Sequence, residues 1–569
     1  MAANHHHHHH HNHNVSNQNN SPKINIFTPE GMKKVEEIFA KNPVNPNEPP
    51  DRNLEQIWLS GNLDTFLVTG EDTNEKYALI DLVIDPQSGP SPHIHTGEEE
   101  VYKVLKGEIT FQEGNNIVVK QAGDLIYLDR DNLHSFRNLG TESARMLLLT
   151  TPAGLEDAFR EAGQPATNPD GPPPMDDVAK LKAAAAKQGI DVYPEALLIG
   201  KPVIDDGGVT IYGDANSETL VGTDGSDLII GRNGKDTING GKDNDIVIGG
   251  TDADTIDGGK GNDIISGRQG DDKLTGGGNQ DTFVVRFAGG TDTITDFGGV
   301  GKGVNLSNNI ISEVDTIQFE GPGLTAKNML LNQNGDDLQI SFVDAEKTGV
   351  ILKDFALENL DNLDKTTGAS VNIGNIIFNG QTTTEDSFDV FNANQQRNTI
   401  FNKNSVTFLN ELDNETKGFN DSNDVINAQG GNDMLKGLSG DDVLRGESGD
   451  DILIGGTGND TLSGGTGNDI LIGGSASKFF DEKFYLNNNP EIGAALTTGK
   501  TNSALKHFLN SGQFEGRLPS KLFSDVYVFG DSLSDDGNIS ALTKGKQPDF
   551  PGFQGRFTNG HVWIETLTS

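Results

Sequence analysis

A nine-residue pattern of glycine-rich turns and single apolar positions covers two stretches of the chain. Eight consecutive copies occupy residues 213–284 and six more occupy 419–472, each close to Gly-Gly-x-Gly-x-Asp-x-apolar-x. Each copy joins a six-residue turn to a three-residue strand whose middle residue is large and apolar, as at Ile229, Val247 and Leu444. Stacked copies would place these side chains inside a coil, so the pattern predicts two parallel β-rolls.

Outside the two arrays the hydrophobic pattern changes several times. Alternating runs at 101–111 and 115–128 predict strands of an antiparallel barrel, and shorter alternating runs between the arrays predict further strands. We therefore expect a mainly β, multidomain protein. Its expected parts are a disordered His/Asn-rich tail or tag (1–22), a barrel with flanking segments (23–165), a linker with a short helix (166–203), a first roll (204–284), a β-rich cap (285–418), a second roll (419–475), a small helical module (476–520) and the start of an α/β domain (521–569).

The sixth position of the repeat is acidic in every copy. Glycine turns allow positive φ angles and close approach, so carboxylates and backbone carbonyls of neighbouring turns can surround a hard cation with oxygen atoms. The alternative is a disordered Gly/Asp-rich linker, but such a linker has no reason to hold a nine-residue phase. We therefore predict calcium ligands at the aspartates of this position, which are Asp227, Asp236, Asp245, Asp254, Asp263, Asp272, Asp281, Asp424, Asp433, Asp442, Asp451, Asp460 and Asp469.

The formal net charge of the chain is −41, which argues against a nucleic-acid partner. Without a cation the clustered carboxylates repel one another, and three-residue strands bury little apolar surface. We therefore expect the arrays to be largely unfolded without calcium and folded with it, at calcium concentrations of roughly 0.1 to 1 mM. No apolar stretch approaches the length of a transmembrane helix, and no N-terminal signal peptide is visible.

The repeats resemble those of the RTX family of secreted calcium-binding proteins. That resemblance implies an extracellular protein exported by type I secretion machinery, and the absence of cysteine from the chain fits it. The tract at residues 5–11 is either an expression tag or a natural His-rich tail, which would bind transition metals weakly.

A second constellation of ligands lies in the predicted barrel. His93 and His95 are two residues apart, so on a strand they point to the same face, and Glu100 and His134 follow on later strands. Three imidazoles and a carboxylate suit one divalent transition metal, with positions left open for a substrate. We therefore predict a metal site at His93, His95, Glu100 and His134.

The two segments that carry these residues resemble the signature motifs of the cupin family, in particular quercetin dioxygenase-like single-domain cupins. The chain departs from the motifs at Gly89, Asp129 and Asp131, none of which is a ligand position. The resemblance implies a cupin β-barrel that holds Fe, Mn, Ni, Cu or Zn, with Glu100 as both ligand and possible base. It leaves the reaction open, from O2 chemistry on a small aromatic or carbonyl compound to isomerisation, sugar binding or storage.

The last segment contains a serine placed where an apolar strand runs into a turn, in FGDSLSDDGN, followed by GRFTNGHVW. Together these stretches resemble the opening of a GDSL (SGNH) esterase or lipase domain, which implies Ser532 as the nucleophile. The family's Asp-x-x-His pair has no counterpart after Ser532, and His561 lies in the wrong segment to replace it. We therefore expect a truncated hydrolase segment without significant esterase activity in this chain.

These observations support two functional hypotheses. The first is a secreted, calcium-dependent RTX enzyme that joins a metal cupin to a GDSL-type ester hydrolase segment, acting on a small-molecule or ester substrate. The second is a non-enzymatic surface or matrix protein in which the rolls are calcium-stiffened spacers and the cupin binds a ligand.

Overall fold

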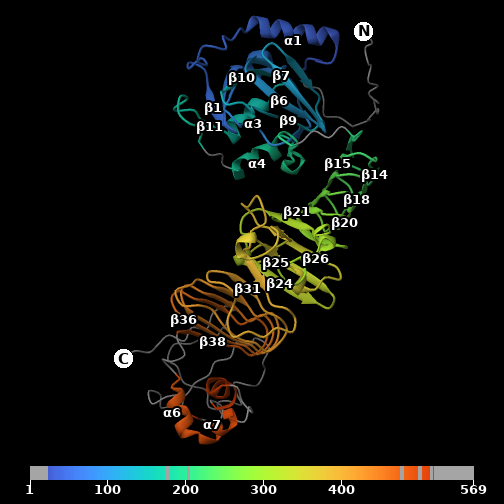
Figure 1. The fold of residues 1–569 in the computed structure, drawn as a ribbon. Coiled ribbons are helices and arrows are strands. Elements are labelled where there is room, and N and C mark those ends of the chain that lie inside the picture. The colour runs from blue at the N-terminus through green and yellow to red at the C-terminus, as the bar shows by residue number, and fades with distance from the viewer. Residues whose placement is uncertain are drawn as a thin grey trace, which may run out of the picture. The chain divides into compact units, whose positions relative to one another are not determined.

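The computed structural model describes residues 23–174, 178–201, 206–474, 480–497, 503–512 and 517. The chain divides into two compact units, residues 1–210 and 211–569, which are described separately (Figure 1). The mainly β fold that the sequence predicts is confirmed. The predicted start of an α/β hydrolase domain, with Ser532 and His561, lies outside the described residues, as does the tail at 1–22.

The N-terminal unit is a sandwich of two antiparallel sheets. The seven-stranded sheet has the order β11-β1-β2-β3-β10-β5-β8 and the five-stranded sheet the order β12-β4-β9-β6-β7. The strands are β1 (Gln56–Leu59), β2 (Asn62–Val68), β3 (Ala78–Ile84), β4 (His93–His95), β5 (Glu99–Lys106), β6 (Glu108–Glu113), β7 (Asn116–Gln121), β8 (Leu125–Leu128), β9 (His134–Arg137), β10 (Ala144–Thr151), β11 (Gln164–Pro165) and β12 (Ile190–Val192).

Apolar side chains cover both faces of the large sheet. One face packs against the small sheet, where the ring centroids of Tyr102, Phe111 and Phe136 lie within 5.9 Å of one another. The other face is covered by α1 (Pro29–Lys41), which buries Val35 and Phe39. The sandwich therefore has a core on each side of its central strands, and this core does not depend on any metal.

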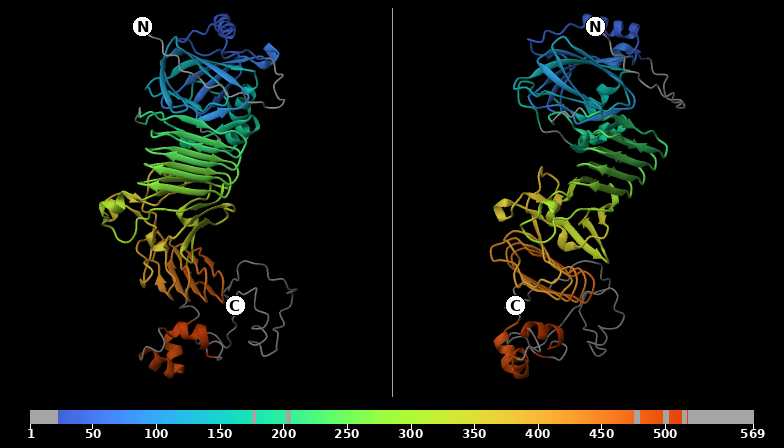
Figure 2. Two further views of the ribbon diagram at one scale, coloured as in Figure 1. Left: turned by 90° about the vertical axis from the view of Figure 1, so that its right-hand side faces the viewer. Right: turned by 45° about the vertical axis from the view of Figure 1, so that its right-hand side comes forward.

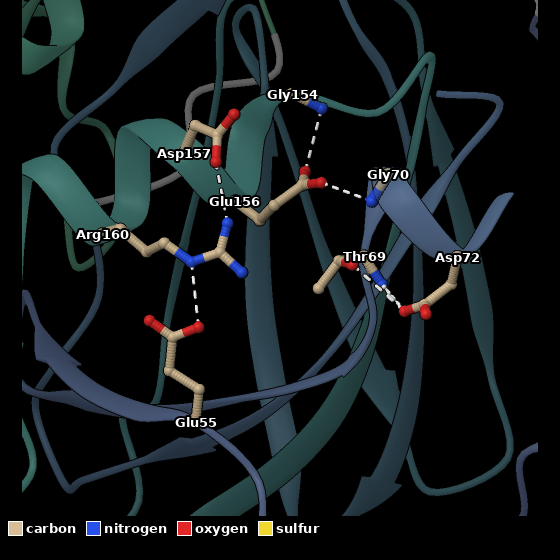
Figure 3. A network of polar contacts seen from close by, with 8 residues as sticks. All are labelled: Glu55, Thr69, Gly70, Asp72, Gly154, Glu156, Asp157 and Arg160. Atoms are coloured by element: carbon tan, nitrogen blue, oxygen red, sulfur yellow. Dashed lines mark hydrogen bonds and ion pairs between the residues drawn. The ribbon is translucent and has the colours of Figure 1, made fainter. Parts of the chain in front are cut away.

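A polar network joins the end of β10 to the turn between β2 and β3 (Figure 3). The buried carboxylate of Glu156, on α3 (Leu155–Ala162), accepts hydrogen bonds from the backbone N–H of Gly70 at 2.7 Å and of Gly154 at 2.9 Å. Gly70 begins the short helix α2 (Gly70–Thr73). The remaining helices of this unit are α4 (Val178–Lys187) and η1 (Pro194–Ala196).

The second unit begins with a parallel coil in which successive strands alternate between two sheets (Figure 2). Partner residues in neighbouring strands are eighteen apart, as for Ile229 and Val247 or Ile238 and Ile256, because two nonapeptides make one turn. These four side chains are at most 1% exposed. The strands are β13 (Thr210–Tyr212), β14 (Thr219–Val221), β15 (Leu228–Arg232), β16 (Thr237–Gly241), β17 (Ile246–Gly250), β18 (Thr255–Lys260), β19 (Ile264–Arg268), β20 (Lys273–Gly278) and β21 (Thr282–Arg286).

The parallel sheets continue beyond residue 284 into the segment that the sequence predicts as a β-rich cap. One sheet extends as β21-β23-β29 and the other as β20-β22-β26, where β26-β25-β24 adds an antiparallel edge. The elements are β22 (Gly290–Ile294), α5 (Asn308–Ile311), β23 (Thr316–Glu320), η2 (Ala326–Asn328), β24 (Met329–Asn334), β25 (Asp337–Phe342), β26 (Thr348–Leu352), η3 (Leu357–Asn359), β27 (Asn362–Leu363), η4 (Lys365–Thr367), β28 (Ile373–Gly374) and β29 (Ile376–Ile377).

The second parallel coil has the sheets β30-β31-β33-β35-β37 and β32-β34-β36-β38. Its strands are β30 (Phe388–Val390), β31 (Val406–Phe408), β32 (Glu415–Lys417), β33 (Val425–Asn427), β34 (Met434–Ser439), β35 (Val443–Arg445), β36 (Ile452–Thr457), β37 (Thr461–Ser463) and β38 (Ile470–Gly474). Short helices follow at α6 (Glu482–Asn488), α7 (Pro490–Thr497), α8 (Ala504–His507) and η6 (Phe508–Gly512). No helix in the described ranges has the length and apolar character needed to cross a membrane.

Candidate metal centres

Three histidines converge between the two sheets of the N-terminal unit. His93 and His95 lie on β4, and His134 begins β9 directly opposite His93. One ligand nitrogen from each lies within 4.8 Å of the other two. His95 and His134 are 2% and 1% exposed, so the cluster is shielded from water.

Backbone carbonyls fix the tautomer of two of these rings. Nδ1 of His93 lies 2.8 Å from the carbonyl oxygen of Ser91, and Nδ1 of His134 lies 3.1 Å from that of Asn132. A carbonyl oxygen only accepts, so in both rings Nδ1 carries the proton and Nε2 keeps its lone pair. Burial, with the charges of His134 and His95, holds the pKa of His93 well below its usual value.

Glu100 completes the cluster from β5. Its Oε2 lies 2.7 Å from Nε2 of His134, and its Oε1 lies 3.7 Å from Nε2 of His95. Burial alone would raise the pKa of this carboxyl group, but His95 and His134 outweigh burial and lower the pKa to about 2. The hydroxyl of Tyr102 donates to Oε2 at 3.3 Å, so the carboxylate is held in place.

The donor set fits a divalent transition metal. Nε2 of His95 is buried without a hydrogen-bond partner, and Nε2 of His134 faces a carboxylate oxygen that cannot donate to its lone pair, which is costly unless a cation faces both nitrogens. Three imidazole nitrogens and one carboxylate are common ligands of Fe, Mn, Ni, Cu and Zn. The structure thus brings together all four predicted residues, and their binding of a metal stays a prediction.

In the rolls, the repeat aspartates form a hydrogen-bonded ladder. The backbone N–H of each acidic residue donates to Oδ1 of the aspartate eighteen residues later, at 2.7 to 3.1 Å. The second oxygen, Oδ2, is buried and has no hydrogen-bond partner in Asp236, Asp245, Asp254, Asp263, Asp272, Asp281, Asp433, Asp442, Asp451 and Asp460.

Each of these Oδ2 atoms except that of Asp433 faces a glycine five residues earlier, at the start of its own turn. A Cβ atom built on Gly258 would lie 2.5 Å from Oδ2 of Asp263 and 2.8 Å from the carbonyl oxygen of Gly276. Carboxylate and carbonyl oxygens therefore converge on a space that a side chain would fill. Such an oxygen cradle suits Ca²⁺.

Burial raises the pKa values of several of the repeat aspartates. Burial raises the pKa of Asp245 to about 8, and the neighbouring carboxylates of Asp263 and Asp227 act in the same direction. Burial likewise raises the pKa of Asp433 to about 8. A charged ladder is therefore unfavourable unless a cation compensates it.

Asp227 and Asp424 differ from the other predicted calcium ligands. Oδ2 of Asp227 accepts a hydrogen bond from the backbone N–H of Thr223, and Oδ2 of Asp424 accepts one from Phe419 at 2.9 Å. Both are the first aspartate at the repeat position of their array. Their carboxylates are satisfied by the protein itself.

Sequence reasoning missed two members of the ladder. The N–H of Asp272 donates to Asp292 at 3.2 Å, and that of Asp281 donates to Asp315 at 2.8 Å. Insertions place these acceptors 20 and 34 residues away, so the nine-residue period does not find them. The signal that remains is local, since each aspartate stands two residues before an isoleucine of a parallel strand, Ile294 or Ile317.

Two family models match parts of the chain. Residues 81–150 match the cupin domain model. Residues 212–247, 248–283, 420–453 and 445–477 match the RTX calcium-binding nonapeptide repeat. The predicted transition-metal ligands lie in the first match and the predicted calcium ligands in the others.

Two curated proteins share short stretches with the chain. It is 34% identical over 64 residues to the oxalate-binding protein of Thermotoga maritima, and 48% identical over 48 residues to the phosphatidylcholine-sterol acyltransferase of Aeromonas hydrophila. These stretches are 11% and 8% of this chain, and they span 53% and 14% of the two relatives.

Among solved structures, the chain is similar to a predicted oxalate decarboxylase of Thermotoga maritima, with 24% identity, 19% of this chain and 98% of that chain covered, and a TM-score of 0.18. It is also similar to an RmlC-like cupin of Shewanella frigidimarina, with 17% identity, 19% and 93% covered, and a TM-score of 0.17. The chain therefore combines a cupin domain with RTX calcium-binding repeats.

Proposed function

We propose that this chain is a secreted, calcium-dependent protein whose cupin domain holds one divalent transition metal and uses it on a small oxygen-containing molecule. The observation that carries the proposal is the convergence of His93, His95, Glu100 and His134, with buried nitrogen atoms that no protein donor satisfies. Four protein ligands leave one or two positions open on a metal that prefers five or six ligands.

Metal analysis of the full chain tests the site. The His-rich tail also binds metals, so the comparison is between wild type and His93→Ala, which share that tail. We expect wild type to retain about one metal ion more per chain, with His507→Ala as a matched control because His507 lies in the helical module. Equal metal content in wild type and His93→Ala would overturn the proposal.

Substrate assays then separate an enzyme from a binding protein. The shared stretch with an oxalate-binding protein favours a dicarboxylate ligand, whereas the resemblance to quercetin dioxygenase-like cupins favours O2 chemistry on a flavonol. Binding is measured with oxalate, and turnover is measured as O2 uptake with flavonols. Metal-dependent O2 uptake supports the enzyme, while oxalate binding without turnover supports the ligand-binding alternative.

The rolls supply the calcium dependence and the proposed route of export. Their carboxylates oppose folding until calcium is present, so the rolls would stay unfolded at low cytosolic calcium and fold outside the cell. This behaviour suits type I secretion, for which RTX repeats are typical. Calcium titration followed by circular dichroism is expected to show a midpoint of roughly 0.1 to 1 mM.

A second candidate function is ester hydrolysis by the segment 521–569, with Ser532 as nucleophile. The shared stretch with a phosphatidylcholine-sterol acyltransferase favours it and points to lipid esters. The test measures p-nitrophenyl ester hydrolysis in wild type, Ser532→Ala and the control Ser534→Ala, because a serine nucleophile is lost in only one of the two variants. Turnover lost only in Ser532→Ala supports this function, and equal turnover in all three proteins would contradict it for this chain.

A further inference from the structure

One carboxylate beside the histidine cluster has no part in the predicted ligand set. Glu98 lies just before β5, and its side chain is 9% exposed. Its Oε2 lies 3.5 Å from Nδ1 of His95. Both atoms are buried and neither has a hydrogen-bond partner, so each is the nearest available group of opposite polarity for the other.

This arrangement distinguishes His95 from the other two histidines. His93 and His134 direct Nδ1 toward backbone carbonyls two residues earlier in the chain, which no side-chain substitution removes. His95 instead directs Nδ1 toward a charged side chain. Its orientation therefore depends on a residue that a single substitution can change.

The backbone of Gly154 lies beside the carboxylate of Glu98. A Cβ atom built on Gly154 would lie 3.9 Å from Oε1 of Glu98, so a glycine backbone borders the carboxylate. Gly154 has a φ of 135°, which favours glycine, and its N–H is bonded to Glu156 (Figure 3). The loop beside Glu98 is thus fixed by the polar network at the start of α3.

We propose that Glu98 is a positioning residue for the cupin metal, a role that rests on the proposed metal site. By accepting the Nδ1–H of His95, Glu98 fixes the tautomer that turns Nε2 toward the metal and makes that nitrogen a stronger donor. If Oε2 of Glu98 moves roughly half an ångström toward Nδ1 of His95, the two atoms form a charge-assisted hydrogen bond. The three imidazoles then differ, with one backed by a carboxylate and two by neutral carbonyls.

The test compares Glu98→Gln with Glu99→Gln in the full chain. Glu99 is an adjacent buried carboxylate, but its Oε1 lies 3.0 Å from Nζ of Lys23 rather than near a histidine. Zn²⁺ affinity is measured by chelator competition, and Cu²⁺ is examined by electron paramagnetic resonance. The signal of His93→Ala is subtracted to remove binding by the His-rich tail.

We expect Glu98→Gln to weaken Zn²⁺ binding by roughly 10- to 100-fold, in the range of outer-shell partners of metal-bound histidines. The Cu²⁺ spectrum should shift toward a higher parallel g value, because one nitrogen donor is weaker, whereas Glu99→Gln should match wild type in both measurements. If the Zn²⁺ affinity of Glu98→Gln lies within about twofold of wild type and its Cu²⁺ spectrum is unchanged, the positioning role of Glu98 is overturned and the metal site is not. If wild type binds no more Zn²⁺ than His93→Ala does, the proposed metal site is overturned as well.

Discussion

The cupin metal centre and the aspartate ladder both gather buried ligands, but they differ in what keeps the ligands together. The cupin histidines lie on the short strands β4 and β9, whose sheet packs against a second sheet with the eight-residue strands β5 and β10 and apolar side chains on both of its faces. The ladder aspartates of the first roll lie between strands of three to six residues, and each of the two sheets contributes one row of buried apolar side chains. We therefore expect the cupin to form its site before metal arrives, and the rolls to need the cation in order to fold.

Calcium removal should separate the two regions most strongly. In excess chelator we expect residues 211–474 to lose most of their protection from hydrogen exchange, because the carboxylates of the ladder then repel one another. The cupin strands should keep their protection. Hydrogen exchange of the full chain, resolved by mass spectrometry, measures both regions at once. If the rolls keep full protection from hydrogen exchange in chelator, the two regions do not differ in their dependence on a cation.

Removing a cupin ligand should give the opposite result. We expect His134→Ala to weaken transition-metal binding by more than the roughly 10- to 100-fold typical of outer-shell partners, because a direct ligand is lost. Exchange protection of β5 and β10 should persist, since their cores do not include the metal. Unfolding of the sandwich in this variant would show that its metal is structural.

A methyl group in the calcium cradle should act locally. Gly258→Ala places a carbon atom against Oδ2 of Asp263, while a Cβ atom on Gly278 meets nothing within 4 Å. We expect Gly258→Ala to cost about 1–3 kcal/mol of roll stability, as overpacking does, and to raise the calcium midpoint. Gly278→Ala is the matched control. Equal midpoints for the two variants would contradict the cradle geometry.

The smallest expected effect is a dependence on pH without calcium. The pKa of Asp245 is about 8 in the calcium-free fold and near the ordinary value of 3.8 when unfolded. The folded state therefore binds more protons between these values, so its stability falls as pH rises from about 4 to about 8. We expect chelator-treated protein to gain β signal by circular dichroism when acidified from pH 8 to pH 5. A loss of signal would contradict the raised pKa values.

The sequence predicted regular features well because their geometry is periodic. The nine-residue period predicted the parallel rolls and their inward apolar positions, and a spacing of two predicted that His93 and His95 point to one face. The eighteen-residue register is a finding of the structure. Asp292 and Asp315 could not be predicted because insertions break the period. Glu98 could not be distinguished from Glu99, since the chain enters β5 through a turn whose geometry the sequence leaves open.

The segment 285–418 shows a further limit. The sequence predicts it as a β-rich cap, and its boundaries stay a prediction. In the structure β22 and β23 pair in parallel with β20 and β21, because the last strands of a roll leave unpaired N–H and C=O groups that a further strand satisfies. Composition marks where the glycine repeats stop, but not where strand pairing stops.

The hydrogen-bonded ladder also gives each roll two unlike ends. The N–H of Asp227 donates to the side chain of Asp245 in the next turn, while the carbonyl of Asp227 accepts the N–H of Ile246 from that turn. Shortening an array from its C-terminal end therefore removes carboxylate acceptors, whereas shortening it from the other end removes carbonyl acceptors. A C-terminal cap must supply carboxylates, and Asp292 and Asp315 supply them for the first roll.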